Sequence, residues 1–164
     1  MDKLQWIKEL VRDEQQMEES GIVEVGSEFD GEKVLREATI EMLNDLKTCF
    51  IECSAAFNQI KSISIGQIKI YAIAKTMADF MLFRNGYKLL FNAKGPGRIQ
   101  VTFVHSGSSF IPGAEETTEN RNQDILVAQW GAFAQVNWTF NNKPIHLDYM
   151  VRYYLTRFIK ESAK

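Results

Sequence analysis

Two cysteines and two histidines could supply sulfur and nitrogen ligands to a metal ion in this chain. Cys49 and Cys53 are four residues apart, so on a helix both thiols would point from the same side. Together with His105 and His146 they could form a tetrahedral Cys2His2 zinc site. Both cysteines, however, fall within an apolar strip, where a small thiol packs like any apolar side chain. We therefore interpret them as packing residues and expect neither a metal nor another cofactor.

The same residue types could also supply a nucleophile and its base. A thiol at Cys49 or Cys53, or a hydroxyl among the serines of residues 106–109, would need His105 or His146 beside it. His105 ends a predicted strand next to those serines, and His146 precedes or caps the last predicted helix. Neither histidine has around it the glycine pattern of a nucleophile elbow or an oxyanion hole. We therefore predict that the protein is not an enzyme.

The glycine-rich segment of residues 94–98 (KGPGR) could bind a phosphate, because its backbone N–H groups are accessible and two cations flank them. It lacks the Lys-Ser/Thr pair and the following helix of a nucleotide-binding loop. We favour the simpler interpretation of a solvent-exposed hairpin turn.

Besides the KGPGR segment, basic residues in the middle of the chain could form a surface that binds anions. Residues 1–59 carry a net charge of −8, from 6 Lys/Arg and 14 Asp/Glu, and residues 60–105 carry +6, from 7 Lys/Arg and one Asp. Cations interleaved with tyrosines could bind phospholipid headgroups or nucleic acid. The candidate anion-binding residues are Arg84, Lys88, Lys94 and Arg98. The pI of about 5.8 is low for a dedicated nucleic-acid-binding protein, and the simpler interpretation is that these cations face the acidic helices.

The elements that must position these residues are organised around residues 79–104, which predict three antiparallel strands. Asn85 and Gly86 both tolerate the positive φ that a two-residue type I′ turn requires, and the KGPGR segment makes the second turn. Both faces of this meander are partly apolar, so helices on both sides, or self-association, should cover them. The predicted cross-strand pairs are Arg84–Tyr87, Leu82–Leu89 and Phe80–Phe91.

Helices and further strands lie on either side of the meander. Residues 2–19, 32–60 and 147–161 show apolar residues at helical spacing. Residues 62–75 predict a strand with a bulge near Gly66, with a helix as the alternative. Residues 124–140 predict either one strand kinked at Gly131 or two short strands.

A long polar loop is predicted over residues 106–123. The resulting fold class is α+β, with an antiparallel sheet of four to five strands packed against long helices from both ends of the chain. We divide the chain into residues 1–30, an amphipathic helix and linker, and residues 31–164, a single α+β domain.

The first helix is the predicted functional element, because a helix of about five turns is marginal alone in water and needs a partner for its apolar side. The predicted partner-binding residues are Leu4, Trp6, Ile7, Leu10 and Val11. The partner is another protein or a second copy of the chain, and nucleic acid or an anionic membrane is the less favoured alternative. We expect a non-enzymatic adaptor, regulator or chaperone-like domain that self-associates.

The charged N-terminus has no apolar region of a secretory signal, and the chain has no run of about 18 apolar residues. With two cysteines and no disulfide framework, the sequence predicts a cytoplasmic location.

Overall fold

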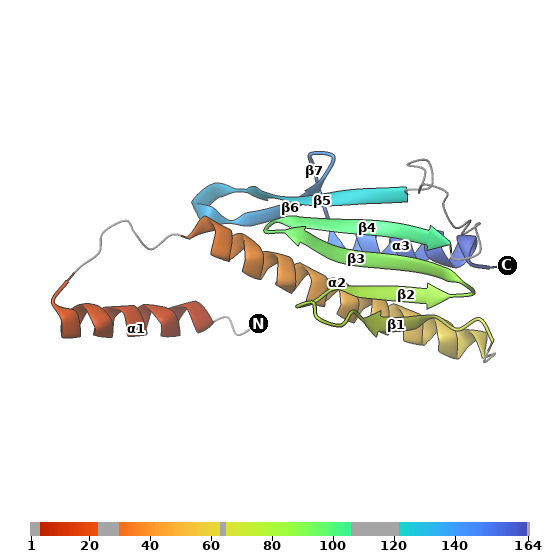
Figure 1. The fold of residues 1–164 in the computed structure, drawn as a ribbon, viewed down its shortest axis with the longest axis horizontal. Coiled ribbons are helices and arrows are strands. Elements are labelled where there is room, and N and C mark those ends of the chain that lie inside the picture. Colours follow the sequence, from red (N-terminus) through yellow and green to blue (C-terminus); the bar gives the residue numbers. More distant parts are fainter. Residues whose placement is uncertain (1–3, 23–29, 63–64, 106–121, 164) are drawn as a thin grey trace. The chain divides into compact units, whose positions relative to one another are not determined.

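A computed structural model describes residues 4–22, 30–62, 65–105 and 122–163. The chain divides into two compact units, Met1–Gly31 and Glu32–Lys164. Helix α1 (Gln5–Ser20) belongs to the first unit. Helices α2 (Gly31–Lys61) and α3 (Leu147–Glu161) form the second unit with the sheet (Figure 1).

The described residues of the second unit contain seven strands in one antiparallel sheet, in which each strand pairs with the next along the chain. The predicted class, α+β with an antiparallel sheet, is therefore confirmed, whereas the predicted count of four to five strands is wrong. The strands are β1 (Lys69–Ala72), β2 (Phe80–Arg84), β3 (Tyr87–Gly95), β4 (Arg98–His105), β5 (Asn122–Trp130), β6 (Val136–Phe140) and β7 (Lys143–Pro144).

The central meander has the predicted register. Arg84 lies opposite Tyr87, Leu82 opposite Leu89 and Phe80 opposite Phe91. The turn residues Asn85 and Gly86 have φ values of 51° and 81°, as a type I′ turn requires. Here turn chemistry and period-2 patterning agree, so the local sequence is enough to specify the pairing.

The strand count differs because residues 124–140 form two strands, one of the two predicted alternatives, and because Lys143–Pro144 adds β7, which was not predicted. After β5, Gly131 and the 3₁₀ turn η2 (Ala132–Ala134) reverse the chain, and Ala128 of β5 then lies opposite Trp138 of β6. Gly131 donates its N–H to the Gln135 carbonyl at 2.7 Å, which closes the reversal. The turn requires positive φ at Phe133 and Ala134, and these residue types rarely adopt it, so the sequence carries no turn signal.

The predicted strand at residues 62–75 is confirmed only for β1. Gly66 has a φ of 82° but lies in a turn before the strand, not in a bulge within it. Residues 63–64, and residues 106–121 of the predicted polar loop, lie outside the described residues. Asn122, assigned to that loop, begins β5.

Helices α2 and α3 both cover one face of the sheet, which lies in front of them in Figure 1. Along α2 the buried positions are Thr39, Leu43, Leu46, Phe50 and Ser54. The spacing of three and four residues places them on one side of the helix. The apolar strip that the sequence predicts on this helix is wider than the buried side. It also includes Cys53, Ala56 and Ile60, which are exposed in the structure. The sheet covers only a narrow side of the helix.

The core is centred on aromatic rings from α2 and the sheet. The Phe50 ring lies 6.1 Å from the Phe80 ring and 5.1 Å from the Phe91 ring, and Phe80 and Phe91 stack at 4.8 Å. Each such side chain stabilises the fold by about 1.5–3 kcal/mol when buried. Helix α3 adds Met150, Val151, Tyr154 and Phe158. The apolar spacing of residues 147–161 predicts that Leu147, Val151, Leu155, Phe158 and Ile159 are buried, which misses Met150 and Tyr154. The Tyr154 hydroxyl donates to Asp124 at 2.7 Å.

Candidate functional site

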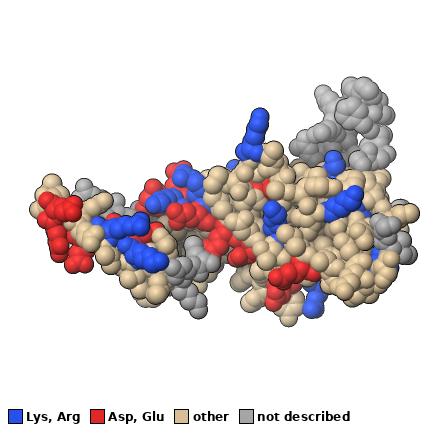
Figure 2. Space-filling view, turned by 90° about the horizontal axis from the view of Figure 1, so that it is seen from below, with Lys and Arg blue, Asp and Glu red and all other residues tan. Residues whose placement is uncertain are grey.

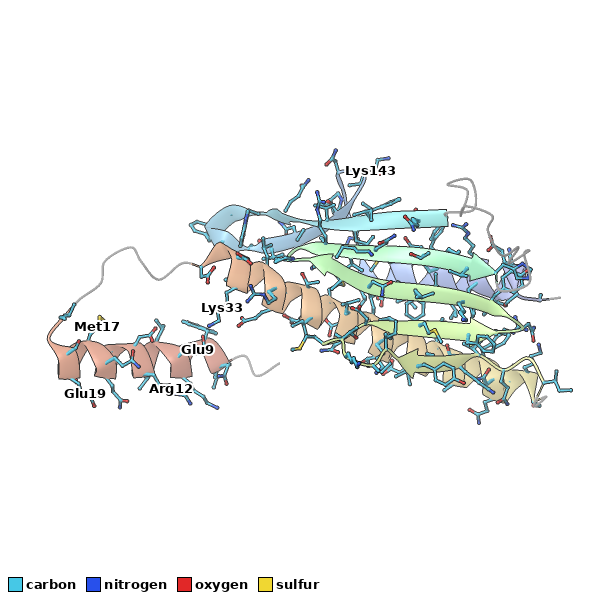
Figure 3. The ribbon with its side chains drawn as sticks, viewed as in Figure 1. Glu9, Arg12, Met17, Glu19, Lys33 and Lys143 are labelled. Atoms are coloured by element: carbon cyan, nitrogen blue, oxygen red, sulfur yellow. The ribbon has the colours of Figure 1, made fainter. Side chains whose placement is uncertain are left out.

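Helix α1 carries an exposed apolar side. The exposed fractions are 60% for Trp6, 40% for Ile7, 53% for Leu10 and 49% for Val11, with 58% for Leu4 at the helix start. No residue of α1, all of which the structure describes, is buried. Arg12 and Glu19 project from one side of the helix and Met17 from the other (Figure 3). The helix is amphipathic because Ile7, Leu10 and Val11 follow one another at helical spacing. The five predicted partner-binding residues therefore lie on one accessible helix.

Helix α1 ends at Ser20, directly before a glycine. Gly21 follows α1 in the left-handed conformation, with φ at 67°, and donates its N–H to the Met17 carbonyl at 2.9 Å. Glycine adopts this conformation without strain, which makes it the usual residue after a helix.

The second candidate surface is the face of the sheet that points away from α2 and α3, which we call the open face. Alternation along the strands places its apolar side chains there: Tyr71, Met81, Phe83, Leu90, Val104, Ile125 and Val127. Tyr71, Val104 and Ile125 remain 40–45% exposed. The first five lie on neighbouring strands from β1 to β4, whereas Ile125 and Val127 lie opposite Gln100 and Arg98. An exposed apolar area on neighbouring strands is typical of an interaction surface.

The open face is also basic. Lys69, Lys88 and Arg98 occupy its positions on β1, β3 and β4. No Asp or Glu of the described strands occupies an open-face position, since Asp124 lies on the opposite face and accepts the Tyr154 hydrogen bond. By contrast, the exposed side of α2 carries the acidic residues Glu37, Glu41, Asp45 and Glu52, and Figure 2 shows acidic and basic side chains over the surface of the chain.

The structure does not bring the four predicted anion-binding residues together. Arg84 points to the helical side of the sheet and is only 3% exposed, whereas Lys88 lies on the open face. Lys94 is six residues from Lys88 along β3, or about 20 Å at the rise of a strand. Lys94 and Arg98 flank the turn between β3 and β4.

Arg84 instead binds the C-terminal end of α3. Its Nε donates to the Gly66 carbonyl at 2.7 Å, and its Nη1 donates to the Ile159 carbonyl at 3.0 Å and the Ser162 hydroxyl at 3.2 Å. The neighbouring Asn85 donates to the Ser162 carbonyl at 2.7 Å. Burial lowers the pKa of the Arg84 guanidinium. A cation is favourable here because the last carbonyls of a helix carry partial negative charge.

The KGPGR turn binds α2 rather than presenting all its N–H groups to solvent. Gly97 donates its N–H to the Thr39 hydroxyl at 2.8 Å, and that hydroxyl donates to the Leu35 carbonyl at 2.7 Å. Gly97 has a φ of 78°, and a Cβ there would lie 3.3 Å from a methyl carbon of Leu35. The turn therefore positions the sheet on α2, and one of its amides is already occupied.

The residues considered for metal or nucleophilic chemistry are spread over the second unit. Cys49 and Cys53 are free thiols on α2, and burial raises the pKa of Cys49. His105 stacks on Tyr87 with ring centroids 4.0 Å apart, and His146 precedes α3. Among the described residues, no group of three or more His, Cys, Asp or Glu could hold a metal ion. The serines considered with His105 lie outside the described residues.

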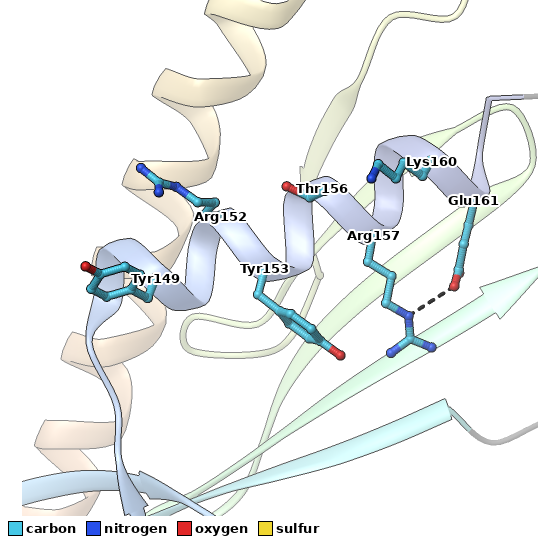
Figure 4. Close-up of a pocket in the computed structure, with 7 residues that line it drawn as sticks. All are labelled: Tyr149, Arg152, Tyr153, Thr156, Arg157, Lys160 and Glu161. Carbon is cyan, nitrogen blue, oxygen red and sulfur yellow. Dashed lines mark hydrogen bonds and ion pairs between the residues drawn. The ribbon is translucent and has the colours of Figure 1, made fainter.

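Two hollows lie beside α3. One follows its outer side, where Arg157 pairs with Glu161 at 3.0 Å (Figure 4), and its lining residues are Tyr149, Arg152, Tyr153, Thr156, Arg157, Lys160 and Glu161. The other, of about 290 Å³, lies between α3 and strands β5–β7 and includes Leu126, Phe140, Ile145 and Met150. Neither gathers a set of groups with a specific chemistry.

No protein-family model, curated protein or solved structure matches the chain. Within the described residues, no helix has both the length and the apolar character needed to cross a membrane.

Proposed function

We propose that this chain is a non-enzymatic protein–protein interaction domain, of the adaptor, regulator or chaperone type, that self-associates in the cytoplasm. The observation that supports the proposal is the exposed apolar side of α1, where Trp6 and Leu10 are each more than half exposed. Tryptophan and other large apolar side chains of an amphipathic helix are frequent anchors of helix-mediated recognition.

The binding free energy that the apolar side of α1 can supply follows from the area it would bury. Complete burial of a large apolar side chain supplies about 1.5–3 kcal/mol, so covering the exposed half of five such side chains supplies roughly 5 kcal/mol. Association costs at least about 4 kcal/mol in lost rigid-body freedom. The apolar side of α1 alone therefore supports only weak binding, and a stable complex needs further contacts on the partner.

The experiment is light scattering across a concentration series of the full chain. We expect a dimer that Leu10→Gln with Val11→Gln, or deletion of residues 1–20, converts to a monomer, because glutamine keeps the helix but not the apolar contact. The control is Ile60→Gln near the end of α2, because Ile60 is apolar and, at 84%, even more exposed than Leu10 and Val11. Two reciprocal contacts of this size against one association cost leave about 6 kcal/mol, or a dissociation constant of tens of micromolar. A wild-type chain that stays monomeric up to roughly 1 mM contradicts self-association.

The alternative function is binding of a phospholipid headgroup or nucleic acid by the basic meander. Its support is weaker because Arg84 and Lys88 lie on opposite sides of the sheet. Salt separates the two functions, since binding of cations to phosphates weakens steeply as salt rises and apolar docking does not.

A further inference from the structure

The apolar side of α1 also carries two carboxylates. With about 3.6 residues per turn, positions 7, 11, 14 and 18 lie on one side of a helix, so Glu14 and Glu18 continue the side formed by Ile7 and Val11. The helix as a whole has two basic and five acidic residues, a net charge of −3. A surface that accepts this side must therefore be apolar for part of its length and must supply cations for the rest.

Pairing of two α1 helices does not meet that requirement. In a parallel pair, Glu14 and Glu18 would each face the same residue of the other helix, and like charges in contact repel. In an antiparallel pair, the carboxylates would face Ile7 and Val11, where burial of an unpaired charge is costly. The acceptor of α1 is therefore a different surface.

The open face has both required properties. Across β1 to β4, one row of directly opposite residues reads Lys69, Phe83, Lys88 and Val104. The adjacent row contains Tyr71, Met81 and Leu90, and no acid of the described strands interrupts either row. The first row ends at Val104, whereas the adjacent row continues through Thr102 to Gln123 of β5. A 16-residue helix is about 24 Å long and spans about five strands at their usual spacing, the number that the adjacent row crosses. Length, apolar content and charge thus match.

We propose that α1 of a second copy lies across the open face, with Glu14 and Glu18 close to Lys69 and Lys88. The proposal rests on the self-association proposed above and names the surface that receives the helix. Each copy has one α1 and one open face, so an exchange between two copies satisfies both surfaces and closes a symmetric dimer. The ion pairs also provide specificity, because the open face would repel a basic helix.

The test is a charge exchange between two full-length variants. The helix variant is Glu14→Lys with Glu18→Lys, and the face variant is Lys69→Glu with Lys88→Glu. Each alone places like charges at the contact, so we expect its dimer dissociation constant to rise at least about tenfold. In an equimolar mixture both contacts have opposite charges again, and we expect a heterodimer within about threefold of wild-type affinity.

The control is Arg152→Glu with Lys160→Glu, which reverses two exposed cations on the outer side of α3 and should leave the dimer unchanged. Circular dichroism and the urea midpoint establish that each variant is folded. If the face variant does not fold, Lys69→Gln with Lys88→Gln replaces it, with an expected loss of about threefold in affinity.

Each result supports or overturns a distinct statement. A wild-type dimer that tolerates both charge variants overturns this inference and leaves the proposed function standing, whereas a wild-type monomer overturns both. Two weakened variants that do not recover on mixing also overturn it, because exchange between copies requires recovery. Binding of a single-stranded oligonucleotide or an anionic vesicle that is lost in the face variant, with the dimer unchanged, would assign the open face to a phosphate ligand instead.

Discussion

Replacing Arg84 by methionine should loosen the C-terminal end of α3. The side chain is almost fully buried and donates to Gly66, Ile159 and Ser162. Methionine keeps most of the apolar volume, including the contact of the side chain with Phe57. It cannot donate a hydrogen bond, so the carbonyls of Gly66 and Ile159 would lose this buried donor.

The expected loss follows from the number of bonds removed. A hydrogen bond to a charged group contributes about 1.5–3 kcal/mol, and three are lost. Removal of a buried charge recovers part of this, because the guanidinium no longer has to be desolvated. We expect a net decrease of about 3 kcal/mol in the free energy of unfolding, or roughly 10 °C in Tm for a unit of this size.

Urea unfolding with linear extrapolation measures this free energy, and an unchanged m value would show that the same surface unfolds. Hydrogen exchange should show the largest loss of protection at Ser162, whose N–H bonds to the Phe158 carbonyl. The matched control is Arg36→Met, since Arg36 is exposed and pairs only with Glu32 at 3.0 Å among the described residues. An Arg84→Met chain as stable as this control would refute the structural role assigned to Arg84.

Three further perturbations follow from the structure. Gly97→Ala should cost about 1–2 kcal/mol in urea unfolding, because its positive φ strains any other residue and the new Cβ would press on Leu35. Ser54→Ala should stabilise the fold by up to about 1 kcal/mol in the same assay, because no described residue bonds the buried Ser54 hydroxyl. Burial and the bond to Asp124 raise the pKa of Tyr154. The unfolded chain then loses that proton first, so stability should fall as pH rises above about 10. Tyr154→Phe should reduce this slope, as measured by the urea midpoint at each pH, and an unchanged slope would contradict the assignment.

Local sequence was most informative where two independent signals agreed. The Asn85–Gly86 turn and the alternation on either side of it gave the register of β2 and β3, which the structure confirms. The spacing of apolar residues identified α2 and the full extent of α3. Local sequence was not informative at η2, where Phe133 and Ala134 adopt a positive φ that their side chains disfavour. The sequence therefore did not distinguish a hairpin of β5 and β6 from a single kinked strand.

The two candidate surfaces also differ in how much of each could be predicted from local sequence. The sequence by itself determined the amphipathic α1 with Trp6 and Leu10 on one side, because helical periodicity is a local property. Only the tertiary structure decided which cations share a surface. Arg84 and Lys88 are four residues apart, yet the strand alternation and the turn between them send one to α3 and the other to the open face. Strand alternation sets which side chains share a face, but which of the two faces is buried depends on where the helices pack. Long-range contacts within the whole second unit determine that packing.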